Sequence, residues 1–171
     1  VKENRLLRCA QLNEASAEEL QKLSDVYHVE TVIDLRTSRE RDYAPDPVLA
    51  QADNIWLPIL NENQKADVDM EQIKAYTLEY GDNPAGEAVA IIRSGYDPSQ
   101  MYREMLRDPY SKNQFHLFID EVLKIKDDHA VLWHCSGGKD RAGTAAVLLL
   151  IALGVDEKTI LDDFELSNMY Y

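Results

Sequence analysis

The feature that most limits the fold of this chain is a polar, glycine-rich segment set between two apolar ones. Residues 130–133 (AVLW) form an apolar run of strand length, and residues 144–153 are nearly all apolar and end before a glycine, as a buried helix does. The ten residues between them, 134–143, read HCSGGKDRAG. A strand, a tight loop and a helix in this order are typical of a parallel α/β sheet, which places the loop beyond the carboxyl end of its strand.

The rest of the chain also alternates between strand and helix patterns. Further strands are predicted at residues 6–12, 31–35 and 54–60, and helices at residues 17–24, 70–80, 100–106, 112–126 and 156–168. We therefore predict an α/β fold with a parallel or mostly parallel central sheet of about four to five strands and helices on both faces. Residues 36–41 are predicted to be a charged loop, and the loops at 36–54 and 81–99 are expected to shape the entrance to any site at the sheet edge.

Composition excludes several classes of function. The chain has 171 residues, 45% of them hydrophobic, which suits one globular domain over residues 1–171, and its net charge of −13 opposes binding to nucleic acid. The longest apolar run, residues 145–153, is about half of the roughly 20 residues that a membrane-spanning helix needs. We expect no transmembrane segment and a soluble protein, either cytoplasmic or secreted. Two cysteines, Cys9 and Cys135, are too few for a cysteine-rich metal site, and we expect neither a metal nor another cofactor.

The loop carries the residues of an anion-binding cradle. Glycine tolerates backbone angles that other residues avoid, so Gly137 and Gly138 allow successive N–H groups to curl around one tetrahedral anion. The helix that follows adds the partial positive charge of its N-terminus. The residues predicted to bind the anion are Ser136, Gly137, Gly138, Lys139, Asp140 and Arg141.

Cys135 opens this cradle and is the predicted nucleophile. The helix N-terminus and Arg141 both favour negative charge there, so we expect Cys135 to be a thiolate at neutral pH. Arg141 can hold two oxygens of a phosphate in a bidentate fork, which also suits the transferring phosphoryl group, and Lys139 adds a second cation. A lone cysteine on a buried strand is more often a core residue, but packing does not explain the glycines, lysine and arginine at this spacing.

A leaving oxygen needs a proton, and an aspartate is the expected donor. Asp140 lies at the edge of the cradle and is the first candidate for the general acid. Asp97 and Asp108, on the segments that precede the helix predicted at 112–126, are the alternatives. A structural role for Asp140, as a negative charge at the helix N-terminus or as a partner of Arg36, is the competing interpretation.

Residues around the cradle are expected to support it. His134 precedes the nucleophile and is predicted to orient the loop through a hydrogen bond rather than to act as a base. Asp34, Arg36 and Glu40 follow each other at the end of an upstream strand on the same sheet edge. One of these two carboxylates is a candidate to brace Arg141, and ordinary surface pairing is the alternative.

Three ordered segments resemble the bacterial tyrosine phosphatases that carry a Lys-Asp pair in their signature loop. The segments are residues 134–143 (HCSGGKDRAG), 32–40 (VIDLRTSRE) and 162–168 (DDFELSN), so the resemblance extends over nearly the whole chain. It implies a tyrosine-phosphatase-like fold and a phosphomonoester hydrolase in which Cys135 forms a phosphocysteine, Arg141 binds phosphate, and Lys139 and Asp140 take part in substrate choice and proton transfer. The implied substrate is phosphotyrosine in proteins, with dual or phosphoinositide specificity as alternatives. The product is inorganic phosphate, and no metal is used.

Two departures from the family pattern have consequences. Many members carry threonine directly after the signature arginine, and its hydroxyl helps the thiolate to leave. Ala142 stands at that position here, so hydrolysis of the phosphoenzyme is expected to be slow. Family segments that precede the region of Arg8 and follow residue 168 have no counterpart, so the domain is expected to be incomplete at both ends.

Other interpretations of the same loop stay open. A rhodanese-like sulfurtransferase also places a cysteine in an anion loop, although the Lys-Asp-Arg ending argues against it. A catalytically weak phosphate-binding module is indicated only by Ala142. A reversible disulfide between Cys9 and Cys135, which would protect the nucleophile from oxidation, is a further hypothesis.

Overall fold

A computed structural model describes residues 2–49, 51–63 and 70–169 of the chain. Within these residues it contains a four-stranded, all-parallel sheet in the order β1-β4-β2-β3, which confirms the predicted α/β fold. The strands are β1 (Leu6–Cys9), β2 (Val29–Asp34), β3 (Asp53–Trp56) and β4 (Ala130–His134). The strand predicted at 54–60 is shorter than expected and ends at Trp56, although the N–H groups of Leu57 and Ile59 still donate to the carbonyls of Asp34 and Leu35.

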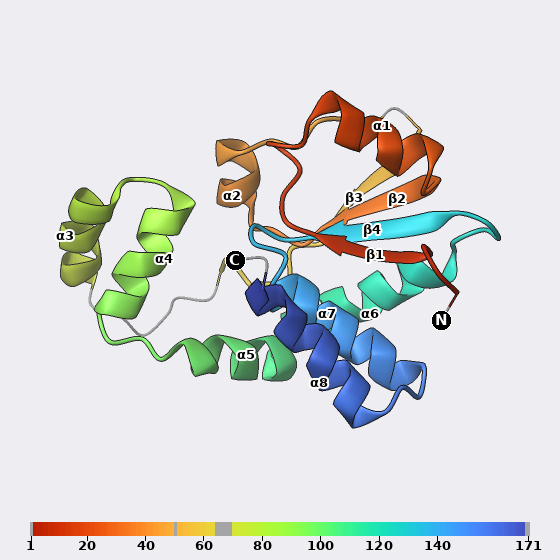
Figure 1. The fold of residues 1–171 in the computed structure, drawn as a ribbon. Helices are drawn as coiled ribbons and strands as arrows, with labels where there is room; N and C mark the ends of the chain where they lie inside the picture. Colours follow the sequence, from red (N-terminus) through yellow and green to blue (C-terminus); the bar gives the residue numbers. More distant parts are fainter. Residues whose placement is uncertain (1, 50, 64–69, 170–171) are drawn as a thin grey trace.

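Helices cover both faces of this sheet. They are α1 (Ala17–Asp25), α2 (Ser38–Tyr43), α3 (Met70–Tyr80), α4 (Pro84–Arg93), α5 (Pro98–Arg107), α6 (Pro109–Leu123), α7 (Asp140–Ala152) and α8 (Glu157–Leu166), with a final turn η1 (Ser167–Met169). Figure 1 shows α1 on one face of the sheet and α6, α7 and α8 on the other. The prediction of helices on both faces is therefore confirmed.

Alternate strand residues face the two helical layers. Ile33 and Trp133 belong to the core beneath α6 and α7, where the Trp133 ring meets Phe118 edge to face at a centroid distance of 5.4 Å. Val32 and Leu132 belong to the core beneath α1. A parallel sheet buried on both faces explains why its strands are apolar without interruption.

Two segments predicted to be loops are helical. In α2, Thr37 and Glu40 form a reciprocal capping box, in which each side chain accepts a hydrogen bond from the backbone N–H group of the other. In α4, Asn83 caps the N-terminus and Pro84 occupies the first turn. The Gly, Asn and Pro residues at 81–84 predict a turn, but they also carry the start signal of a helix.

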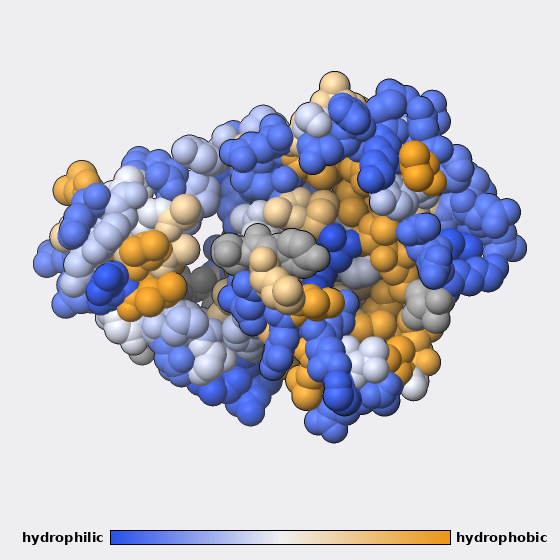
Figure 2. Space-filling model, viewed as in Figure 1, coloured by the Kyte–Doolittle hydropathy of each residue, from blue (hydrophilic) through white to orange (hydrophobic). Residues whose placement is uncertain are grey.

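The helices α3 and α4 pack on each other and stand beside the sheet, to which α5 leads back (Figure 1). Arg39 of α2 bonds Asp82 at 2.7 Å and pairs with Glu87 of α4 at 3.1 Å. Figure 2 shows apolar side chains on the surface of this helical pair, where Leu78 and Ile92 are exposed. No helix of the described residues is long and apolar enough to cross a bilayer.

Candidate active site

The loop between β4 and α7 is held by the backbone on both sides. β4 lies between β1 and β2, and beyond its end the N–H group of Gln11 donates to the carbonyl of Ser136 (3.1 Å). The N–H group of Leu35 donates to the carbonyl of His134 (3.0 Å). Gly138 has a φ of +69°, and a Cβ at this residue would lie 2.4 Å from a carbonyl oxygen of β1. The close approach to β1 therefore requires glycine there.

The helix after the loop begins at Asp140, earlier than the sequence suggested. Lys139 is its N-cap, and within the described chain the Lys139 side chain makes no capping hydrogen bond to α7. The N–H groups of the first turn of α7 are thus directed toward the loop without a side-chain cap from that position. A helix end of this kind attracts an anion, as the sequence predicts for this loop.

Cys135 and His134 are both buried at the start of this loop. Cys135 is 2% exposed and lies in the core beneath α7, and His134 is fully buried. The Nδ1 atom of His134 lies 3.3 Å from the Cys135 carbonyl oxygen, and its Nε2 atom lies 3.3 Å from a carboxylate oxygen of Asp46. An orienting role for His134 stays a prediction, for which the contact of Nδ1 with the Cys135 carbonyl is the candidate hydrogen bond.

The two cysteines lie on opposite faces of the sheet. Cys9 is aligned with His134 in the β1–β4 register and belongs to the core beneath α1, whereas Cys135 belongs to the core beneath α7. Both thiols are free. Burial raises the pKa of Cys9 to about 12, with the charges of Asp46 and Cys135 adding to the effect. The arrangement disfavours a disulfide between the two residues.

Arg141 is held by Glu40, one of the two carboxylates considered for this role. Its Nη1 and Nη2 atoms donate to the two oxygens of Glu40 at 2.5 and 2.6 Å, and the hydroxyl of Ser136 donates to the same carboxylate at 2.5 Å. Burial works against the charge of Glu40, but the contacts with Arg141 and Ser136 outweigh it and lower the pKa to about 2. The negative charges of Glu40 and Cys135 in turn raise the pKa of Arg141, although burial opposes them.

This geometry orients the guanidinium for a ligand. Glu40 also accepts hydrogen bonds from the N–H and hydroxyl groups of Thr37, so its carboxylate is fixed by the start of α2. The end of the Arg141 fork is occupied by Glu40, which leaves the Nε side of the planar group for a phosphate. An arginine fixed in advance stabilises developing negative charge without reorganisation.

The three candidate proton donors have different environments. Asp140 is the first residue of α7, and its carboxylate accepts a hydrogen bond from the hydroxyl of Tyr102 in α5. Asp97 caps α5 and bonds Ser99 and an arginine of the same helix, and Asp108 caps α6. Both of the latter serve as helix caps, so Asp140 is the candidate that the fold places in the loop.

Asp34 and Arg36 lie beside the loop in a buried charge cluster. Arg36 is fully buried; it bonds Asp34 through two parallel hydrogen bonds of 2.9 Å and also bonds Asp46. Asp34, Asp46 and His134 offer ligand atoms within 4.8 Å of one another, the spacing of a metal site. The Arg36 guanidinium already bonds both carboxylates, so a cation would have to displace it.

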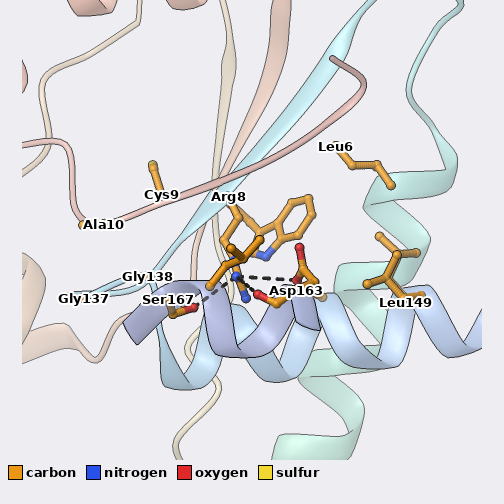
Figure 3. Close-up of a pocket in the computed structure, with 13 residues that line it drawn as sticks. Leu6, Arg8, Cys9, Ala10, Gly137, Gly138, Leu149, Asp163 and Ser167 are labelled. Carbon is orange, nitrogen blue, oxygen red and sulfur yellow. Dashed lines mark hydrogen bonds and ion pairs between the residues drawn. The ribbon is translucent and has the colours of Figure 1, made fainter. Parts of the chain in front are cut away.

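Residues 162–168, the third segment of the family resemblance, pack behind the loop. Arg8 of β1 donates to the carbonyl of Asp163 and the hydroxyl of Ser167, both at 3.1 Å (Figure 3). These residues line a cavity of about 590 Å³ that also reaches Gly137 and Gly138. The cavity lies on the β1 side of the loop, whereas Arg141 meets Glu40 on the α2 side. The cavity therefore lies on the side where β1 and α8 hold the loop, and not on the side where Arg141 would bind an anion.

The packing of α8 and Arg8 also explains why residue 143, the last of the glycine-rich segment 134–143, is a glycine. A Cβ at Gly143 would lie 2.8 Å from the ring of Phe164 in α8 and 3.0 Å from Nη1 of Arg8. α8 can approach α7 this closely only where the side chain is absent. The packing of α8 against the first turn of α7 thus depends on Gly143.

Three site residues have weak sequence signals. The Thr37 to Glu40 capping box could have predicted α2, but nothing local indicates that Glu40 also reaches Arg141, 101 residues away. Asp46 lies in an irregular segment after α2. Tyr102 lies in a helix that the sequence predicts, yet periodicity does not show that its hydroxyl reaches a loop 38 residues further along the chain.

The chain is similar to a known protein family and to two curated proteins. A family model described as "Tyrosine phosphatase family" matches residues 1–171. A protein of Cupriavidus necator, provisionally named a tyrosine-protein phosphatase, is 29% identical over 170 residues, which are 98% of this chain and 55% of the relative. A protein of Nostoc commune named tyrosine-protein phosphatase is 30% identical over 138 residues, which are 81% of this chain and 40% of the relative. The chain thus spans about half the length of these curated relatives.

A solved structure was also found. It is TpbA of P. aeruginosa in complex with phosphotyrosine, which is 15% identical and superposes with a TM-score of 0.40. The alignment covers 95% of this chain and 68% of that chain.

Proposed function

The chain belongs to the tyrosine phosphatase family, and on that premise we propose that it hydrolyses phosphotyrosine in proteins through a phosphocysteine on Cys135. The observation that carries the proposal is the Arg141–Glu40 pair beside a cysteine at the N-terminus of a buried helix. We also propose that residues 1–171 act as one domain, because β1, α2 and α8 all contribute to the support of a single loop.

In the first step, the thiolate of Cys135 attacks phosphorus. An Sγ–P bond forms as the bond from phosphorus to the tyrosine oxygen breaks, and Asp140 gives its proton to the departing oxygen. The N–H groups of the loop and Arg141 stabilise the three equatorial oxygens of the transferring group. Ser136, Gly137, Gly138, Lys139 and Asp140 would supply these backbone N–H groups, while Lys139 adds positive charge near the site.

In the second step, water attacks the phosphocysteine. Asp140, now ionised, takes a proton from the water, the P–Sγ bond breaks, and inorganic phosphate and the Cys135 thiolate are released. Ala142 follows Arg141, is fully buried and carries no hydroxyl to assist the departing thiolate. Its carbonyl accepts a hydrogen bond from the Trp133 indole (3.0 Å), which fixes the backbone at this position. We therefore propose that the second step limits turnover.

The preference for phosphotyrosine over a phosphoinositide rests on charge. The net charge of −13 repels an anionic lipid surface, and such repulsion acts on the whole protein and not only on the site. Hydrolysis rates for a phosphotyrosine peptide, a phosphoserine peptide and phosphoinositide vesicles, measured side by side, test this preference. A higher rate on the vesicles than on the phosphotyrosine peptide would contradict it.

Substitution of the nucleophile tests the reaction itself. Cys135→Ser is expected to abolish hydrolysis of p-nitrophenyl phosphate, because an alcohol at this position is not ionised. Wild-type rates in this variant would refute the proposal. Persulfide formation on Cys135 after treatment with thiosulfate, with no phosphatase activity, would support the sulfurtransferase alternative. A phosphocysteine that forms but never turns over would support the phosphate-binding module.

A further inference from the structure

Tyr102 of α5 makes two contacts, one with the start of α7 and one with α8. Its hydroxyl donates a hydrogen bond to Oδ1 of Asp140, the first residue of α7. Its ring meets Phe164 of α8 edge to face at a centroid distance of 6.4 Å and an interplanar angle of 67°. Tyr102 is half-buried against the core that also holds Cys135. The ring contact sets the position of the hydroxyl, and the hydroxyl contacts the loop.

The hydroxyl of Tyr102 is a constant donor in this environment. Burial raises the pKa of Tyr102 well above its ordinary value, and the hydrogen bond to Asp140 and the charges of Asp140 and Cys135 raise it further. Tyr102 therefore keeps its proton at neutral pH. A neutral hydroxyl that donates to Oδ1 leaves Oδ2 as the oxygen that carries a transferable proton.

From this geometry we infer that Tyr102 is a positioning residue that orients the Asp140 carboxyl toward the leaving oxygen. The inference rests on the proposed function, since it needs Asp140 to deliver a proton in the first step. The other two aspartates considered for proton transfer are fixed as helix caps, and Asp140 is fixed by a residue from a different helix. Correct placement of a proton donor matters because a misplacement of about 1 Å can cost about 100-fold in rate.

A purely structural role for Tyr102 makes a different prediction. If the side chain only fills space between α5 and α8, removal of the hydroxyl affects all substrates alike. If it positions a proton donor, the loss depends on the leaving group. Phenolate from phenyl phosphate is a poor leaving group and needs a proton, whereas 2,4-dinitrophenolate departs without one.

The test compares Tyr102→Phe with wild type on phenyl phosphate and on 2,4-dinitrophenyl phosphate. The variant keeps the ring that contacts Phe164 and loses only the hydroxyl. We expect kcat/KM on phenyl phosphate to fall about 10- to 100-fold, and this loss to exceed the loss on 2,4-dinitrophenyl phosphate by at least about tenfold. Tyr96→Phe is the matched control, because the Tyr96 hydroxyl donates to the carboxylate of Glu104 at an exposed position (3.1 Å).

A double variant separates action through Asp140 from any other effect. In the Asp140→Asn background, Tyr102→Phe is expected to cause no further loss on phenyl phosphate, because the donor that it positions is already absent. The inference would be overturned if Tyr102→Phe lost the same activity on both substrates, or if it caused its full loss again in the Asp140→Asn background. In either case, hydrolysis by the wild-type protein would still support the proposed function. A wild-type protein that hydrolyses neither substrate would refute the proposed function and the inference with it.

Discussion

From the contact between Glu40 and Arg141 we predict how much Glu40 contributes to the free energy of unfolding. The pKa of Glu40 falls from 4.5 to about 2 in the folded protein, and about 1.36 kcal/mol corresponds to each pH unit. Ionisation of Glu40 therefore stabilises the fold by about 3 kcal/mol. The side chain is only 14% exposed, so solvent screens this contribution little. Glu40→Gln, which resembles the protonated carboxyl, is expected to lower the free energy of unfolding by this amount at pH 7.

The effect has a defined dependence on pH. A carboxyl whose pKa is depressed on folding contributes fully above its unfolded value of 4.5, and the contribution disappears as pH falls through the folded value of about 2. At pH 3 the difference between wild type and Glu40→Gln should be about 1.4 kcal/mol, less than half of that at pH 7. Urea unfolding followed by tryptophan fluorescence, to which Trp133 in the core beneath the loop and Trp56 both contribute, measures the difference at both values of pH.

A matched control isolates burial as the cause. Glu87 also pairs with an arginine, Arg39, at 3.1 Å, but its side chain is 40% exposed. Glu87→Gln should therefore change the stability by at most about 0.5 kcal/mol. A loss below about 1 kcal/mol for Glu40→Gln at pH 7, or a loss that is the same at pH 7 and pH 3, would refute the reasoning.

Three further predictions concern other parts of the site. Gly138→Ala should destabilise the protein by at least about 2 kcal/mol and lower its Tm by roughly 4–8 °C in calorimetry, because the residue has a positive φ and a Cβ there meets β1; an unchanged Tm would contradict the close approach. Ala142→Ser should raise the steady-state rate and reduce the burst of p-nitrophenol in stopped-flow experiments, because a hydroxyl can assist the departing thiolate; an unchanged burst would place the slow step elsewhere. Arg36→Met should cost about 3–5 kcal/mol in urea unfolding, because the buried Asp34 and the half-buried Asp46 lose their shared cation, and a loss near zero would show that the cluster is solvated.

The sheet and the loop could be predicted from sequence because their signals are local. Residues 130–133 and 31–35 are apolar on both faces, which only a covered parallel strand requires, and glycines between a strand and a helix indicate a ligand loop. The helix α4 was not predicted because the same residues that end one element, Gly, Asn and Pro, also begin the next. Local rules do not distinguish the two cases when both occur together.

The contacts that complete the site were not predictable for a different reason. Glu40 reaches Arg141 only because α2 follows directly after β2, the strand beside β4. That outcome depends on strand order, which periodicity does not encode. Glu40 and Asp34 are equivalent candidates from their positions in the sequence, and the tertiary structure pairs Glu40 with Arg141 and Asp34 with Arg36.

The strand order also gives a central position to the loop after β4, which contains the proposed nucleophile Cys135. In the order β1-β4-β2-β3, β4 has parallel neighbours on both sides, so its C-terminal loop receives backbone hydrogen bonds from the continuations of both β1 and β2. A loop after β1 or β3 would be supported on one side only, because these are the edge strands. Two-sided support matters for an anion cradle, since its N–H groups stabilise charge only when they are held in place before the anion arrives. An edge position would leave the loop free to turn its N–H groups toward water, whereas the central position holds this short glycine-rich segment in place from both sides.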